Sequence, residues 1–210
     1  MSNAACYDDE KQKDKQQWKI TEDLMTIVMG MIIGTTPLII VQSSFTLEVA
    51  LILFFLNNSI VIDDWWTTLR FTGKYDCNLK PGHTILITLI YENALIFLTI
   101  WLLAASYSAV PLEGYLLILL GINVLDVMWC QSVLSANPQL PDNDYLRTHA
   151  WLAGDVAGAF LFLFGFFFLH FAHVEPLVSA LTFVALYVVG RFLDEVVISR
   201  ALKQMVRRKK

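Results

Sequence analysis

Apolar residues run along this chain in six long segments separated by shorter polar breaks. A helix that crosses about 30 Å of hydrocarbon needs about 20 mostly apolar residues. Each segment is close to that length, so the pattern predicts an all-α polytopic membrane protein with six transmembrane helices. The predicted spans are Leu24–Gln42, Phe45–Ile62, Thr84–Tyr107, Leu112–Leu134, Ala150–His170 and Leu177–Ile198.

The polar breaks alternate between short and long, which arranges the spans as three hairpins. Ser43-Ser44, Val110-Pro111 and His173–Pro176 are short turns, and Asp63–His83 and Gln139–His149 are longer loops. The chain then divides into a polar tail over residues 1–20, a six-helix domain over 21–200 and a basic tail over 201–210.

The distribution of Lys and Arg predicts the orientation of these spans. Except for Arg191, every Lys and Arg falls before the first span, after the sixth span or in the two longer loops. Cationic residues are retained on the cytoplasmic side of a membrane. Both termini are therefore expected in the cytoplasm, and the protein in a plasma membrane or a bacterial inner membrane.

The composition strengthens the membrane prediction and narrows the chemistry. Apolar residues make up 56% of the chain and charged residues 16%, with a mean hydropathy of +0.56. A soluble domain has about 45–50% apolar and 25% charged residues. The three Cys are too scattered for a disulfide framework or a zinc site, the four His have no ligand-like spacing, and no nucleotide-binding or hydrolase motif occurs. We expect no metal and no cofactor, and an enzyme is the least favoured class.

Ionisable and amide side chains inside the spans carry the functional argument. At about 1.5 Å of rise per residue, they lie about 8–12 Å from the cytoplasmic ends of their helices. One charge near mid-membrane costs about 2.5–3.5 kcal/mol, so these groups are expected to face one another or water. The set consists of Glu92, Asp126, Asp155, Arg191, Asn57, Asn58 and Asn123.

Two further expectations follow for this polar layer. Arg191 is the in-membrane cation, and we expect it to pair with Asp126 or Asp155. Toward the outer side, the first span offers Thr35, Thr36 and Pro37, of which Pro37 removes a backbone hydrogen bond and is expected to kink the helix. These three residues are the predicted outer gate.

Small residues predict where helices pack closely. Gly30-xxx-Gly34 and Gly154-xxx-Gly158 match the spacing that lets helix backbones approach in lipid. Packing inside one subunit is the favoured interpretation, and dimerisation is the alternative. The segment Phe160–Phe171 is apolar nearly all round, so it is expected to face lipid or a neighbouring subunit in a homo-oligomer.

The leading functional hypothesis is translocation of a small ion or a proton-coupled solute through a cavity that opens to the cytoplasm. The alternative is a membrane-embedded interaction or sensor subunit, whose buried charges fix helix register and whose cytoplasmic loops dock a protein partner. The bilayer is the expected environment. The basic cluster Arg207–Lys210 is too short to favour nucleic-acid binding and suits anionic lipid instead.

Overall fold

The computed structural model describes residues 23, 26–41, 44–75, 81–136, 142–193, 196 and 200, with side chains described except at 64–75, 81–89, 136 and 142–144. Every regular element in these ranges is helical, so the all-α prediction is confirmed. The predicted tails, residues 1–20 and 201–210, lie outside the described residues.

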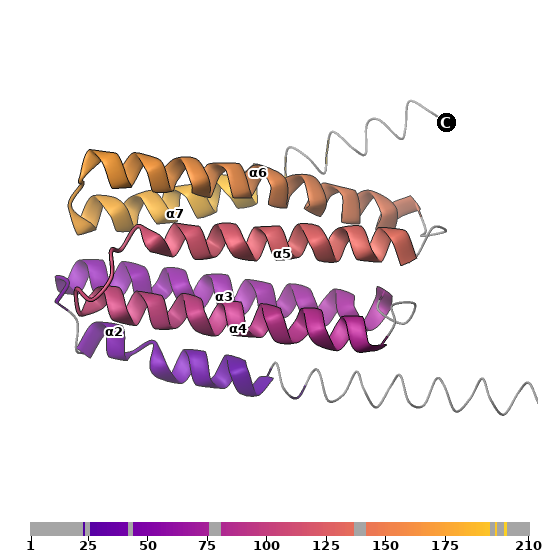
Figure 1. The fold of residues 1–210 in the computed structure, drawn as a ribbon, viewed down its shortest axis with the longest axis horizontal. Helices are drawn as coiled ribbons and strands as arrows, with labels where there is room; N and C mark the ends of the chain where they lie inside the picture. The colour runs from indigo at the N-terminus through magenta and orange to yellow at the C-terminus, as the bar shows by residue number, and fades with distance from the viewer. Residues whose placement is uncertain are drawn as a thin grey trace, which may run out of the picture.

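A helical segment over residues 26–35 is followed by six helices. These are α2 (Leu38–Val41), α3 (Leu47–Tyr75), α4 (Pro81–Ser106), α5 (Gly114–Ala136), α6 (Asp142–Ala172) and α7 (Pro176–Phe192). The long helices lie side by side with their axes nearly aligned (Figure 1).

The two predicted long loops are wrong in extent, because helices occupy most of both. α3 continues past Ile62 to Tyr75, and α4 begins at Pro81. Proline suits the first position of a helix, where its missing N–H has no partner to lose. α6 likewise begins at Asp142, an acidic residue that suits the positive end of the helix dipole. The consequence is that Asp63 lies inside a helix rather than in a loop.

One end of the bundle, which we call the short-turn end, carries the connections before α3, between α4 and α5, and between α6 and α7 (Figure 1). Ser44 fixes the first of these connections to the second. Its backbone N–H and its Oγ donate to the carbonyl oxygen of Ser106, at 2.7 and 2.6 Å. The opposite end, where α3 meets α4 and α5 meets α6, is the long-loop end.

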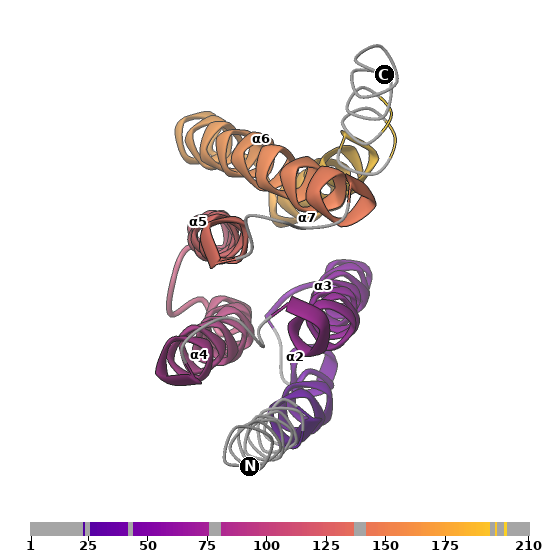
Figure 2. The same cartoon turned by 90° about the vertical axis from the view of Figure 1, so that its right-hand side faces the viewer.

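Viewed end-on, α2, α3 and α4 form one group and α5, α6 and α7 another (Figure 2). α5 packs against α4 and α6, and α7 packs against α6 and α3, which joins the groups at two seams. The core includes Leu53, Leu98, Leu116 and Phe183, none of which has exposed surface. Tyr115 stacks on the Phe183 ring, with centroids 5.4 Å apart.

The outward surface of the bundle is strongly apolar. Phe160, Phe164 and Phe171 on α6 are 69%, 70% and 73% exposed. Within the described residues, Gly114–Ser135 and Tyr145–Ala172 are long and apolar enough to cross a membrane. Only 28% of each span is buried, whereas the core helix of a soluble protein is mostly buried. These two helices indicate membrane association.

Within the described residues, the other apolar helices are too short to cross a membrane. Thr26–Val41, Ile90–Ser106 and Pro176–Phe192 each have 10–17 residues. The six-span topology and its orientation therefore stay predictions.

The predicted kink in the first apolar segment is present. Residues 26–35 are helical, Thr36 and Pro37 form a turn, and α2 follows. The N–H of Ile39 then bonds to the carbonyl of Thr36 at 3.0 Å, a tighter spacing than in an α-helix. Proline, which has no N–H and clashes with the preceding turn, accounts for the break.

Candidate functional site

A pocket of about 90 Å³ lies between α3, α5, α6 and α7. Its apolar wall is formed by residues such as Leu119, Ile122 and Phe162. Its polar residues come from all four helices. They are Asp63, Asn123, Asp126, Asp155, Tyr187 and Arg191.

These polar residues share one level of the bundle. At about 1.5 Å per residue, Asp63 lies about 24 Å from the start of α3, and Arg191 lies about 22 Å from the start of α7. Both helices start at the short-turn end, so the pocket lies nearer the long-loop end. Of the seven residues predicted for the polar layer, Asp126, Asp155, Arg191 and Asn123 line it.

Arg191 forms an ion pair with Asp63, which ties α7 to α3. Its Nη2 donates to Asp63 Oδ1 at 3.0 Å. The Tyr187 hydroxyl donates to Asp63 Oδ2 at 3.4 Å, from one turn earlier on the same face of α7. The side chains of Arg191 and Asp63 are 37% and 27% exposed, so the pair lies at a partly accessible part of the pocket.

The choice of Asp63 corrects the predicted pairing of Arg191 with Asp126 or Asp155. The error follows from the helix boundary, because the prediction puts Asp63 at the start of a loop whereas α3 continues past it to Tyr75. Tyr187 was also missed. Its spacing of four residues from Arg191 is the sequence signal that both side chains lie on one face of a helix.

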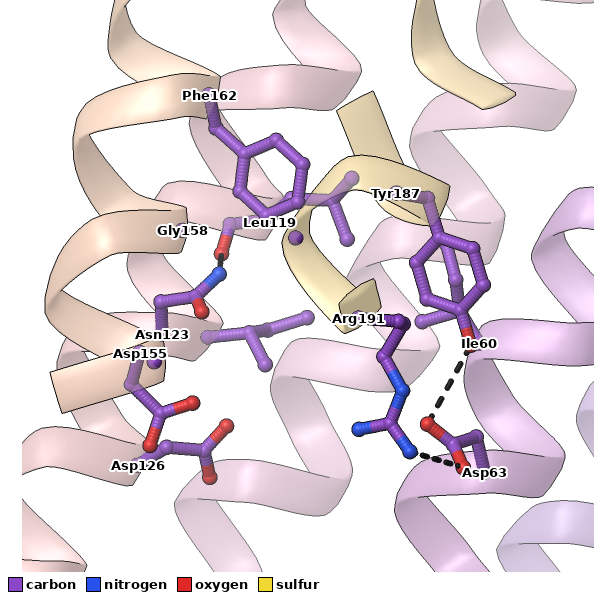
Figure 3. A pocket seen from close by; sticks show the side chains of 13 residues that line it. Ile60, Asp63, Leu119, Asn123, Asp126, Asp155, Gly158, Phe162, Tyr187 and Arg191 are labelled. Atoms are coloured by element: carbon purple, nitrogen blue, oxygen red, sulfur yellow. Dashed lines mark hydrogen bonds and ion pairs between the residues drawn. The ribbon is translucent and has the colours of Figure 1, made fainter. Parts of the chain in front are cut away.

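Asp126 on α5 and Asp155 on α6 lie next to each other on the opposite side of the pocket (Figure 3). The guanidinium of Arg191 lies between this pair and Asp63 in that view. Three carboxyl groups and one guanidinium thus share the pocket. Such an arrangement suits binding of a small polar or charged solute.

Asn123 adds an amide to the wall, and Gly158 makes room for it. The Asn123 Nδ2 donates to the Leu119 carbonyl at 2.9 Å. A Cβ at Gly158 would lie 2.8 Å from Asn123 Oδ1. The predicted packing role of Gly158 is therefore a contact between α5 and α6 within one chain, and Gly154 lines the same pocket.

A Gly158→Ala variant is expected to lose about 1–3 kcal/mol of unfolding free energy, because the new methyl group overpacks the contact with Asn123. The Gly121→Ala variant is the matched control, since a Cβ at Gly121 meets nothing within 4 Å. Unfolding in mixed micelles, followed by circular dichroism, measures both. Adding Asn123→Ala to Gly158→Ala should recover part of the loss, and no recovery would contradict the proposed clash.

The other predicted glycine pair makes no close packing contact with the described part of the chain. Gly30 and Gly34 are exposed, and a Cβ at either would meet nothing within 4 Å. The favoured interpretation, packing within one subunit, is therefore not what the structure shows for this pair. Close packing occurs instead at Gly114 against the Trp101 indole and at Gly165 against Leu186, neither of which has a matching motif.

Asn57 and Asn58 are not among the residues that line the pocket, and they belong to buried hydrogen-bond networks. Asn57 donates to Thr99 Oγ1 and accepts from the Tyr115 hydroxyl, both at 3.1 Å. Asn58 Nδ2 donates to Thr36 Oγ1 at 3.2 Å. These bonds connect α3 to α4, to α5 and to the turn before α2.

The three predicted gate residues separate in the structure. Thr36 is fully buried in its contact with Asn58, whereas Thr35 and Pro37 are exposed. Thr35 Oγ1 donates to the carbonyl of Met31, one turn back in its own helix, at 2.9 Å. Only Thr36 faces the interior.

Glu92 is also separate from the pocket. It lies on α4, which contributes no lining residue, and is 3% exposed. Its Oε1 has no hydrogen-bond partner among the described residues.

The His and Cys residues lie apart from the pocket among the described residues. No group of three or more His, Cys, Asp or Glu in the described part of the chain is placed to hold an ion. His170 Nδ1 instead lies 3.3 Å from Glu113 Oε1, at the short-turn end. Cys130 is buried and forms no disulfide among the described residues.

The fold and the pocket together define a helical bundle with an apolar exterior and a mixed-charge interior cavity. Comparison with protein families, with curated proteins and with solved structures found no match to this chain. The functional argument therefore rests on the geometry of the pocket.

Proposed function

We propose that this protein is an integral membrane protein that moves a small ion or a proton-coupled solute through the pocket between α3, α5, α6 and α7. The observation that carries the proposal is the convergence of Asp63, Asp126, Asp155 and Arg191 from four helices on one cavity. Ionisable groups inside a membrane bundle are costly and mark a solute pathway by default.

The size and position of the pocket support this function. One water molecule needs about 10–15 Å³ of cavity volume on the same scale, so 90 Å³ suits several waters or one small solute. The pocket lies near the long-loop end, which is the cytoplasmic end if the six predicted spans and the Lys and Arg distribution hold. Both termini then lie in the cytoplasm.

The packing toward the short-turn end favours a transporter or a gated pathway over a permanently open pore. Leu53, Leu116 and Phe183 fill that half of the core without exposed surface. A solute in the pocket would therefore need the helices to move before it could leave on the far side. The seam between α3 and α7, closed by Asp63, Tyr187 and Arg191, is the proposed place of that movement.

Flux across liposomes tests the proposal. Reconstituted wild-type protein is expected to move protons, sodium, potassium or chloride faster than empty vesicles. Asp155→Asn should lower that flux by at least about tenfold, which corresponds to about 1.4 kcal/mol. Glu48→Gln is the matched control, because Glu48 is exposed in the first turn of α3, away from the pocket. Wild-type flux equal to that of empty vesicles for all four ions would refute transport.

The ion pair favours one alternative function, an interaction or sensor subunit in which buried charges only fix helix register. In that case Asp155→Asn and Arg191→Gln would lower stability or the recovery of a partner, with no flux to lose. The exposed Gly30 and Gly34 are available for self-association in either case, since small residues on a helix face let a second helix approach.

A further inference from the structure

Glu92 is a buried carboxyl group that the pocket does not use. Its side chain is 3% exposed, and Oε1 has no hydrogen-bond partner in the described part of the chain. It lies about 21 Å from the end of α4 at Ser106, so it shares the level of the pocket while lying on a different helix. A buried polar oxygen without a donor costs free energy, which calls for an explanation.

The helices packed against α4 are α5, α3 and α2. Among their described side chains and those of α4 there is no Lys or Arg. Among the described side chains of these helices, the titratable groups are Glu48 and Asp63 on α3, Tyr91 on α4, and Tyr115, Asp126 and Cys130 on α5, and Tyr107 directly follows α4. All of these groups are neutral or anionic, so none of them supplies a positive charge to Glu92.

A carboxyl group that is buried among packed helices, with no Lys or Arg among the described side chains of those helices, favours its neutral form, which holds a proton. We propose that Glu92 is a proton-binding site distinct from the pocket, and that proton binding there is coupled to movement of the solute. The inference that Glu92 binds a proton rests on the burial of its side chain. The coupling rests on the proposed transport function.

The structure offers a physical connection between the two sites. Thr99 lies two turns from Glu92 on the same face of α4, and it accepts a hydrogen bond from Asn57 on α3. Asn57 in turn accepts a hydrogen bond from the Tyr115 hydroxyl on α5. α3 and α5 carry Asp63, Asn123 and Asp126 to the pocket, so a shift of α4 bears on the helices that form it.

Labelling with the hydrophobic reagent dicyclohexylcarbodiimide tests the proton site in membranes. The protonated carboxyl adds across one C=N bond: its oxygen bonds to the central carbon and its proton moves to nitrogen. The resulting O-acylisourea rearranges to a stable N-acylurea, which mass spectrometry locates on a peptide. We expect the adduct on Glu92 of the wild-type protein, with labelling that falls as the pH is raised. Glu92→Gln should lose the adduct, and Glu113→Gln should keep it.

Wild-type labelling decides the site even if Glu92→Gln fails to fold. Absence of the adduct at every pH, or equal labelling at acidic and alkaline pH, would overturn the proton site. Glu48, which is exposed, should instead react with a water-soluble carbodiimide and serves as the accessibility control.

The coupling is tested with proteoliposomes that carry an internal pH dye and an imposed potassium diffusion potential. Proton uptake is expected in the wild-type protein and its loss in Glu92→Gln. The sodium, potassium or chloride flux seen with the wild type should persist in Glu92→Gln, but in this variant it should no longer follow a pH gradient. Unchanged proton uptake in Glu92→Gln would overturn the coupling. A wild type that moves no ion would refute the proposed transport function and the coupling with it, and the labelling result would still decide whether Glu92 binds a proton.

Discussion

Asp63→Asn and Arg191→Gln are each expected to lower the free energy of unfolding by about 2–3 kcal/mol. Breaking a fully buried ion pair by removing one partner costs about 3–5 kcal/mol, because the other charge stays behind uncompensated. The two side chains here are 27% and 37% exposed, and solvent screening reduces the cost. An uncompensated charge inside a membrane bundle costs about 2.5–3.5 kcal/mol, which supports the same range.

A double-mutant cycle separates the pair from its surroundings. The double variant Asp63→Asn/Arg191→Gln should lose less than the sum of the single losses, with a coupling energy of about 1–2 kcal/mol. Unfolding by sodium dodecyl sulfate in mixed micelles, followed by circular dichroism, gives each value. Tyr187→Phe should lose less than either charge variant, since its bond to Asp63 is 3.4 Å long. Strictly additive single losses would show that Arg191 and Asp63 do not depend on each other.

The level of the polar site was predictable from the sequence, because the rise of a helix is fixed. Counting residues from the ends of the spans placed Asp126, Asp155, Arg191 and Asn123 in one layer. The structure brings these four side chains to one pocket. The free-energy cost of charges in hydrocarbon gave the reason for them to face inward.

The partner of each side chain was not predictable, because it depends on the rotation of the helices and on where they end. Asp63 directly follows the apolar run that ends at Ile62, and a hydropathy pattern cannot tell a helix that stops there from one that continues to Tyr75. Counting residues along the helix puts Asn57 and Asn58 at the level of the same polar layer. Their rotation on α3 turns them toward Thr99, Tyr115 and Thr36 instead.

The glycines show the same limit. The spacing of Gly30 and Gly34 is the one expected at a close helix contact, yet both face outward. Gly114 and Gly165 have no such spacing, yet the space that a Cβ would need at each is occupied by the side chain of Trp101 and of Leu186, respectively. What decides a glycine contact is the size of the side chain on the opposite helix, which no pattern within one helix reveals.

These contacts suggest a division of labour inside the bundle. Among the described residues, the seam between α3 and α7 includes the ion pair of Arg191 with Asp63 and the hydroxyl contact of Tyr187, and the paired side chains are partly exposed. The junction of α3, α4 and α5 is closed by hydrogen bonds with no exposed surface at Asn57. We therefore expect the second junction to be the more rigid of the two, and the proposed transport to move the helices at the first.

The rigidity of that junction leads to a large expected effect at Asn57. Asn57→Ala should lower the free energy of unfolding by about 2–4 kcal/mol, because it opens a cavity in the core and removes two interhelical hydrogen bonds. Hydrogen bonds between membrane helices average about 0.6 kcal/mol and reach about 1.7 kcal/mol. Thr99→Val and Tyr115→Phe, which each remove one bond and little volume, should therefore each lose about 0.6–1.7 kcal/mol.

Ser59→Ala is the control for this series, because Ser59 lies two residues along α3 on its exposed side. Unfolding in mixed micelles should place it within about 0.5 kcal/mol of the wild type, as is usual for surface substitutions. Ion flux in liposomes gives a second readout. An Asn57→Ala protein that still folds should retain the flux that Asp155→Asn loses, because Asn57 does not line the pocket. If Asn57→Ala kept the stability of Ser59→Ala but lost the flux, Asn57 would belong to the solute pathway and not to the scaffold.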